Sequence, residues 1–149
     1  MWIIIFIVFI LFNIIAFFVP KRIDKVVIYS TCFFAYAYGL TFDMIFDLHY
    51  DFYGYFQKGF QWKGFFGTIL YFPSISLLFL NFFPFEQKIS IKLLYTLCWS
   101  IFSTFFEWVS IQTGFFYHNE WKLWYSALLY PIIFFTLVIN MRFVQKINR

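Results

Sequence analysis

The segment TLCWSIFSTFFEWVSIQTG, from Thr96 to Gly114, decides what kind of fold this chain can adopt. It is apolar enough to lie in a bilayer as a helix, yet it carries the carboxylate of Glu107. A helix turns by about 100° per residue, which places its polar and small residues within roughly 40° of one line. A carboxylate that faces hydrocarbon costs about 3 kcal/mol or more, so we expect this line to face protein or water and Glu107 to point into a bundle. The residues of this polar stripe are Thr96, Ser100, Ser103, Glu107, Ser110 and Gly114.

The composition of the whole chain is that of a membrane protein. Of its 149 residues, 63% are hydrophobic and only 12% are charged, and the mean hydropathy is +0.78. A soluble domain cannot carry such a surface, and this length allows one compact unit without a separate soluble domain. We therefore expect an all-α fold, a single membrane-embedded domain over residues 1–149 with a bundle of five transmembrane helices. The expected spans are residues 2–19, 26–46, 65–85, 91–112 and 123–141.

The longest connection, residues 48–64, is rich in aromatic residues and glycine. It holds three of the six glycines, three tyrosines, three phenylalanines and Trp62. Tyrosine and tryptophan prefer the membrane–water interface. We expect this loop to lie along the bilayer surface or to enter it partway.

The distribution of basic residues predicts the orientation of the chain. With five spans, eight lysines and arginines fall on the side that holds the carboxyl terminus, and three fall on the other side. Because lysine and arginine are retained on the cytoplasmic side, we expect the amino terminus outside and the carboxyl terminus inside. The inner group is Lys21, Arg22, Lys25, Lys88, Lys92, Arg142, Lys146 and Arg149, and the outer group is Lys58, Lys63 and Lys122.

The net charge of +4 does not indicate a nucleic-acid partner, because the basic residues lie in short loops and form no basic helix or patch. The two cysteines, Cys32 and Cys98, lie inside expected spans and are interpreted as packing residues. Their number and spacing predict neither a disulfide framework nor a metal site, and no cofactor is expected. The expected partner is the lipid bilayer; a homo-oligomer or a contact with another membrane protein stays open.

Two carboxylates lie at a similar depth in the expected bundle. Asp43 and Glu107 both fall roughly 5–8 Å below the outer boundary of their spans. Ala35 and Gly39 are small and four residues apart, which favours close helix packing, so we expect the second and fourth spans to be neighbours. The candidate ligand- or ion-binding residues are Glu107, Asp43, Asp47, Asp51 and His118, with Lys63, Lys122, Gln112 and Tyr125 in support.

Three functions are compatible with this acidic cluster. In a structural role, the acids pair with Lys63 and Lys122 and hold the loops to the bundle. In a cation or proton site, carboxylates in a low dielectric bind an ion or titrate. In an intramembrane enzyme, Glu107 or Asp43 acts as general acid or base on a lipid or isoprenoid substrate. The sequence favours a non-enzymatic protein with a structural or cation-binding site, because no zinc, phosphate-binding or serine-nucleophile motif is present.

Several segments of the chain resemble those of a known group of proteins. The segments are FDLHYDFYGYF (residues 46–56), QWKGF (61–65), NFFPF (81–85), FEW (106–108) and WKLWYS (121–126), followed by the pair YP (130–131). As a set they are similar to an uncharacterised family of small multi-spanning membrane proteins from bacilli, clostridia and related endospore-forming bacteria. The resemblance covers most of the chain from Pro20 onward. It implies a location in the bacterial plasma membrane and no particular activity.

Overall fold

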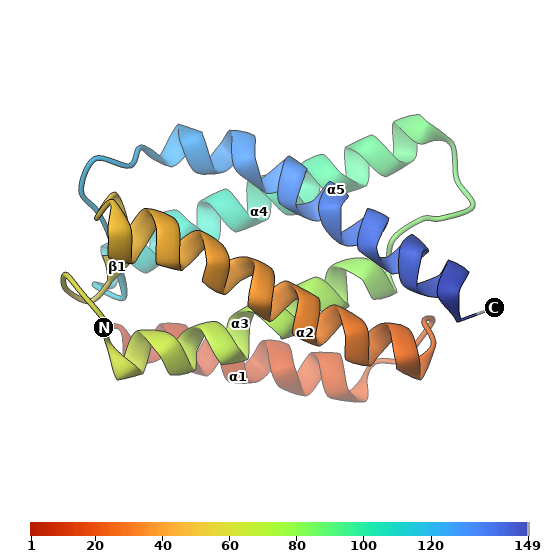
Figure 1. The fold of residues 1–149 in the computed structure, drawn as a ribbon, viewed down its shortest axis with the longest axis horizontal. Coiled ribbons are helices and arrows are strands. Elements are labelled where there is room, and N and C mark those ends of the chain that lie inside the picture. The colour runs from red at the N-terminus through yellow and green to blue at the C-terminus, as the bar shows by residue number, and fades with distance from the viewer. Residues whose placement is uncertain (149) are drawn as a thin grey trace.

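The computed structural model describes residues 1–148, so Arg149, one of the expected inner basic residues, lies outside the described part. The chain folds into a bundle of five helices with a small two-stranded sheet at one end (Figure 1). The amino terminus lies at the end that carries the sheet and the carboxyl terminus at the opposite end. The elements are α1 (Ile3–Phe18), α2 (Lys25–Phe42), η1 (Asp43–His49), β1 (Tyr53–Tyr55), α3 (Trp62–Asn81), α4 (Ile89–Gln112), β2 (Phe116–His118) and α5 (Leu123–Ile147).

The expected helical class is confirmed, and the helix boundaries differ at several ends. Helix α2 continues into η1, a seven-residue π-helical segment. Helix α3 ends at Asn81, before the expected residue 85, and Pro84 three residues later cannot continue a helix. Three helices, α3, α4 and α5, are long and apolar enough to cross a membrane, and α1 is a shorter apolar helix.

The sheet was not predicted, and it gives the connection over residues 48–64 a short strand. Strand β1, in this loop, pairs antiparallel with β2, which follows α4 some sixty residues later in the chain. Tyr53 lies opposite His118, and Tyr55 lies opposite Phe116. Three-residue strands carry almost no periodic signal in a sequence. The pairing therefore depends on the bundle, which brings the two connections together.

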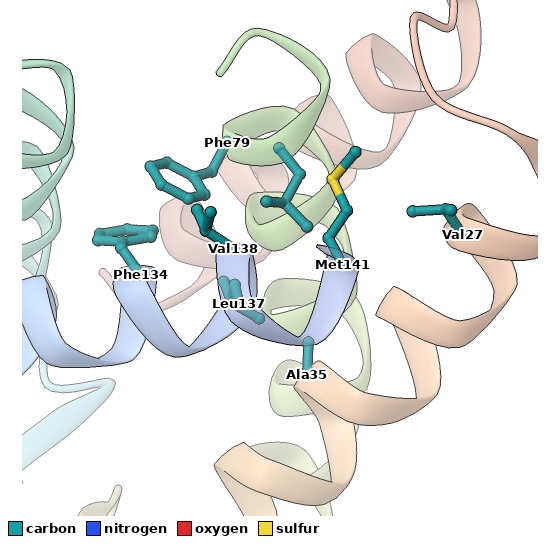
Figure 2. Packing of buried hydrophobic residues seen from close by; sticks show 8 residues of the cluster. Val27, Ala35, Phe79, Phe134, Leu137, Val138 and Met141 are labelled. Carbon is teal, nitrogen blue, oxygen red and sulfur yellow. The ribbon is translucent and has the colours of Figure 1, made fainter. Parts of the chain in front are cut away.

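An apolar core occupies the half of the bundle away from the sheet (Figure 2). Phe79 of α3 and Phe134 of α5 face each other there, with ring centroids 4.4 Å apart. Figure 2 shows Leu137 and Met141 on α5 and, on the neighbouring α2, Val27 and Ala35 of the same cluster. A second, smaller cluster of Ile5, Phe9 and Phe115 ties α1 to the end that carries the sheet.

The expectation that the second and fourth spans are neighbours is wrong. Helix α2 packs mainly on α3 and α5, and α4 packs mainly on α5. The small residue Gly39 does mark a close approach, but its partner is α3: a Cβ at this position would lie 2.5 Å from Cε2 of Phe72. Small residues show that a helix is approached closely, and they do not show by which helix.

Candidate functional site

Glu107 lies on the inner face of α4, where the polar stripe predicted from the sequence is confirmed. Ser100, Ser103, Glu107 and Ser110 are all buried, while Thr96 is half-buried and Gly114 is exposed. Four of the serine and threonine hydroxyls on α4 donate to the carbonyl four residues earlier, so their hydrogen bonds are satisfied within the helix. The carboxylate cannot do so, and its partners come from other elements.

Two hydroxyls donate hydrogen bonds to the carboxylate of Glu107, and one imidazole nitrogen lies within hydrogen-bond distance of it. The Oγ of Ser126 donates to Oε1 at 2.7 Å, and the hydroxyl of Tyr130 donates to Oε2 at 2.5 Å. Nε2 of His118 lies 2.8 Å from Oε1. Ser126 in turn accepts a hydrogen bond from the indole nitrogen of Trp121, at 2.7 Å. A buried carboxylate is thus held by groups from α5 and from the sheet.

Two local geometries bring these donors to Glu107. Ser126 and Tyr130 are four residues apart near the start of α5, so they share one helix face, and this face packs on α4. His118 is the last residue of β2, directly after the turn that ends α4. The chain therefore folds back on α4, and His118 returns to the level of the glutamate eleven residues before it.

Asp43, at the junction of α2 and η1, is held by two tyrosines of β1. The hydroxyl of Tyr53 donates to Oδ1 at 3.1 Å, and that of Tyr55 donates to Oδ2 at 3.0 Å. The two tyrosines are two residues apart in a strand, so their side chains leave the same face of the sheet. Burial beside the carboxyls raises the pKa of Tyr53, which keeps this tyrosine a neutral donor at physiological pH.

The register of the sheet joins the two carboxylate sites. Residues directly opposite each other in an antiparallel pair share one face. Tyr53, which binds Asp43, lies opposite His118, which binds Glu107. One face of a six-residue sheet thus supplies donors to acids on two different helices.

Glu107 and Asp43, which the sequence places at a similar depth, line the same cavity. The cavity has a volume of about 150 Å³ and lies between α2, α3, α4 and α5. Ten of its 21 lining residues are aromatic. Ser76 of α3 also lines it and is only 5% exposed. The aromatic residues of the wall are Tyr38, Phe42, Tyr53, Tyr55, Tyr71, Phe72, Phe116, Trp121, Tyr130 and Phe134.

The prediction that Lys63 or Lys122 pairs with Glu107 is wrong. The ammonium of Lys63 lies 4.6 Å from the ring centroid of Trp2 instead, where it makes a cation–π contact. Lys122 is exposed at the start of α5. Long lysine side chains gain by keeping the ammonium in water, so shorter groups fill the space around the carboxylate.

The two other supporting residues also lie away from the acids. Gln112 is exposed at the last position of α4. Tyr125 packs against Trp121 and Trp124, with no hydrogen bond to either Glu107 or Asp43. Neither residue lines the cavity.

Asp47 and Asp51 follow Asp43 along the chain but do not reach the cavity. Asp47 is buried, and its Oδ1 has no hydrogen-bond partner within residues 1–148. Asp51 lies at the surface, where Lys58 donates to its Oδ2 at 2.6 Å and Tyr117 donates to its Oδ1 at 3.1 Å. The Lys58 ammonium and its hydrogen bond hold the pKa of Asp51 below its usual range. The expected acidic cluster therefore separates into a cavity pair and a surface ion pair.

The residues that sequence reasoning missed are the neutral donors. The spacing of Ser126 and Tyr130 was a usable signal, because a serine and a tyrosine four residues apart form a polar edge on an otherwise apolar helix. Tyr53 and Tyr55 were counted as interface aromatics, and nothing in the sequence distinguishes a buried tyrosine from one at a membrane surface.

Within the described part of the chain, no lysine or arginine forms an ion pair with Glu107 or Asp43, and the salt bridges are those of Asp51 with Lys58 and of Glu107 with His118. His118 is the group beside Glu107 that can carry a positive charge. Residues 1–148 contain no group of three histidine, cysteine or acidic side chains placed to share one metal ion.

Comparisons with known proteins leave the site to be interpreted from its geometry. No protein-family model matches the chain, and no curated protein or solved structure is significantly similar to it. The resemblance to the small membrane proteins of endospore-forming bacteria stays a prediction from the segments that carry it.

Proposed function

We propose that this chain is a multi-pass membrane protein whose central cavity binds a small organic cation, and that it has no enzymatic activity. The observation that carries the proposal is the pair of buried carboxylates, Glu107 and Asp43, which line one aromatic cavity without a lysine or arginine partner among residues 1–148. Tyrosine and serine donors satisfy the hydrogen bonds of these carboxylates and leave their charge uncompensated.

A buried charge without a counter-charge is costly, so such a site takes up a proton or a cation. Asp43 is 8% exposed and has two neutral phenols as partners. Glu107 is equally buried and has one partner that can be charged, His118. The two acids thus have one imidazole as their basic neighbour, which suits a ligand with a single positive charge.

The aromatic wall favours an organic cation of the ammonium type. Ammonium groups are attracted to the faces of tryptophan, tyrosine and phenylalanine, and aromatic cages recognise alkylated ammonium ions in this way. Trp121, Tyr38 and Phe42 supply such faces beside the carboxylates. A volume of about 150 Å³ is below the roughly 300 Å³ at which sites for drug-sized ligands begin. The geometry therefore supports a small cation better than a lipid or isoprenoid substrate.

The proposal includes five transmembrane spans, with the amino terminus and the sheet outside and the carboxyl terminus inside. The bias of eight to three in basic residues supports this orientation. Exposed apolar side chains along α1 and α2, such as Ile7, Ile14 and Phe33, support the membrane insertion of these two helices as well. The bacterial plasma membrane is the location that the family resemblance implies.

The binding site is tested by the thermal stability of the detergent-purified protein in tetramethylammonium chloride, with sodium chloride at the same concentration as reference. We expect a saturable rise in Tm with tetramethylammonium alone, because a ligand at 100 times its Kd adds about 2.7 kcal/mol. Asp43→Asn and Glu107→Gln should abolish the rise, and Glu120→Gln, which removes an exposed acid of the same end, should keep it. An equal rise in both salts, or an unchanged rise in both cavity variants, would overturn the proposal.

A second variant keeps this test independent of the carboxylates. Ile133→Trp places a larger side chain on the wall of the cavity and leaves every hydrogen bond of Glu107 in place. We expect a folded protein without the tetramethylammonium response. A response equal to that of the wild type would show that the ligand binds elsewhere.

The orientation is tested separately by thiol labelling in intact cells, on a background with Cys32 and Cys98 replaced by serine. Cysteines at Lys58 and Asn119, in the connections that hold the sheet, should react with an impermeant reagent added outside. A cysteine at Gln145, in the last turns of α5, should react only after the cells are opened. Labelling of Gln145→Cys in intact cells would refute the proposed orientation.

A further inference from the structure

A second concave site lies at the end of the bundle opposite the sheet. It has a volume of about 830 Å³ and is lined by the α1–α2 connection, the α3–α4 connection and the last turns of α5. Figure 1 shows these segments converging on the end that carries the carboxyl terminus. Its charged residues are three cations, Arg22, Arg142 and Lys146, and one acid, Glu86. None of the four takes part in a salt bridge within residues 1–148.

Arg22 is positioned by a buried polar contact. Asn81, at the last turn of α3, is only 3% exposed. Its Oδ1 accepts a hydrogen bond from the backbone nitrogen of Arg22 at 2.8 Å, and its Nδ2 donates to the carbonyl of Pro20 at 3.1 Å. The guanidinium carbon of Arg22 lies 5.5 Å from the ring centroid of Phe82. The connection between α1 and α2 is thus fixed to α3, and it holds an arginine at the rim of the site.

The site combines this positive charge with an apolar floor and apolar surroundings. Phe82, Phe83 and Met141 line it together with the charged residues. Phe17 and Phe18, at the end of α1 and a few residues before Arg22, are 77% and 76% exposed. A molecule with a negative headgroup and a long apolar part matches both features.

We propose that this site binds the phosphate headgroup of an anionic phospholipid. Arginine guanidinium groups bind phosphate oxygens in pairs of parallel hydrogen bonds. Basic pockets between membrane helices at the cytoplasmic side bind such headgroups. The acyl chains of the lipid lie against the exposed aromatic residues of α1. The inference rests on the membrane insertion proposed above and is independent of cation binding, because no residue lines both this site and the cavity of Glu107 and Asp43.

The experiment is native mass spectrometry of the protein, exchanged into detergent that contains equal amounts of dioleoyl phosphatidylglycerol and dioleoyl phosphatidylcholine. We expect preferential retention of phosphatidylglycerol. The double variant Arg22→Gln/Arg142→Gln should retain it about 30-fold less, from the loss of two basic contacts. The matched control is Lys88→Gln/Lys92→Gln, which removes the same charge at the same end of the bundle from residues that do not line the site. This control should retain the lipid as the wild type does.

Each other outcome counts against the site. Equal retention of both lipids would show that the headgroup charge is not recognised. An equal loss in the two double variants would show that net charge alone attracts the lipid. Displacement of phosphatidylglycerol by millimolar inorganic phosphate would show a site for free phosphate and would overturn the lipid assignment. Asn81→Leu gives a further test: because it releases the Arg22 connection without removing a charge, it should also weaken retention.

Discussion

The two halves of this bundle are held together by different means, although α4 and α5 contribute to both. In the half that carries the sheet, the buried acids Glu107 and Asp43 are fixed by five hydrogen bonds or close polar contacts from histidine, serine and tyrosine. In the other half, Phe79, Val138 and Met141 fill the space with apolar groups (Figure 2).

The two halves therefore contribute differently to the fold. In a bilayer, lipid tails are as apolar as leucine, so an apolar core gains mainly by close packing. A buried polar group, by contrast, has few acceptable partners, and each one is directional. The polar half therefore determines which elements meet, and the apolar half determines how closely they fit.

The largest expected effect is that of Glu107→Leu, which removes the acceptor of the Ser126 and Tyr130 hydroxyls and the polar partner of His118. We expect a loss of about 4 kcal/mol in the free energy of unfolding, since breaking a buried network leaves its partners unsatisfied. Glu107→Gln retains the shape and an acceptor and should cost about 1 kcal/mol. The measurement is unfolding of the detergent-purified protein, with the exposed Phe105→Leu of the same helix as control. If Glu107→Leu is as stable as the wild type, the polar half does not specify the fold.

The matching change in the apolar half is Phe79→Ala. Phe79 is fully buried and contacts Phe83, Tyr95, Trp99 and Phe134. The cavity left behind should cost about 3 kcal/mol. Phe79→Leu should lower the free energy of unfolding less than Phe79→Ala, because at this position only the filled volume matters. At Glu107, by contrast, a conservative substitution must also keep a hydrogen-bond acceptor. Equal losses for Phe79→Leu and Phe79→Ala would contradict this distinction.

An intermediate effect is expected where α2 approaches α3. A side chain at Gly39 would overlap the ring of Phe72, so Gly39→Leu should lower stability by about 2 kcal/mol through forced repacking. Leu40→Phe, at the neighbouring half-buried position, is the control and should change stability much less. Similar losses for the two variants, in thermal unfolding, would show that this contact can open without strain.

The smallest effect is expected at the surface, from the ion pair of Asp51 and Lys58. The pKa of the Asp51 carboxyl is depressed in the folded state. The ion pair therefore contributes to stability above the unfolded pKa of about 3.9, and this contribution is lost as the pH falls through the folded pKa. Unfolding curves of the wild type and Asp51→Asn should therefore differ slightly at pH 7 and converge at low pH. A difference that grows below pH 4 would contradict the assignment.

The sequence by itself determined the helical class, the approximate helices and the burial of the α4 stripe. These follow from local periodicity and from the cost of placing a carboxylate in hydrocarbon, and each can be worked out along a single helix. It also predicted that Asp43 and Glu107 lie at a similar depth, and both acids line one cavity. His118 was one of the candidate residues, and it lies beside Glu107.

Only the tertiary structure decided which groups hold the acids. From charge alone, Lys63 and Lys122 were predicted as the partners of the acids. In the structure the acids accept hydrogen bonds from the hydroxyls of Ser126, Tyr130, Tyr53 and Tyr55. Attraction between charges is long-ranged and can be anticipated from a list of residues. A hydrogen bond requires a donor within about 3 Å in the right direction. That position is set by the crossing of α4 with α5 and by the register of two short strands some sixty residues apart, which no local pattern encodes.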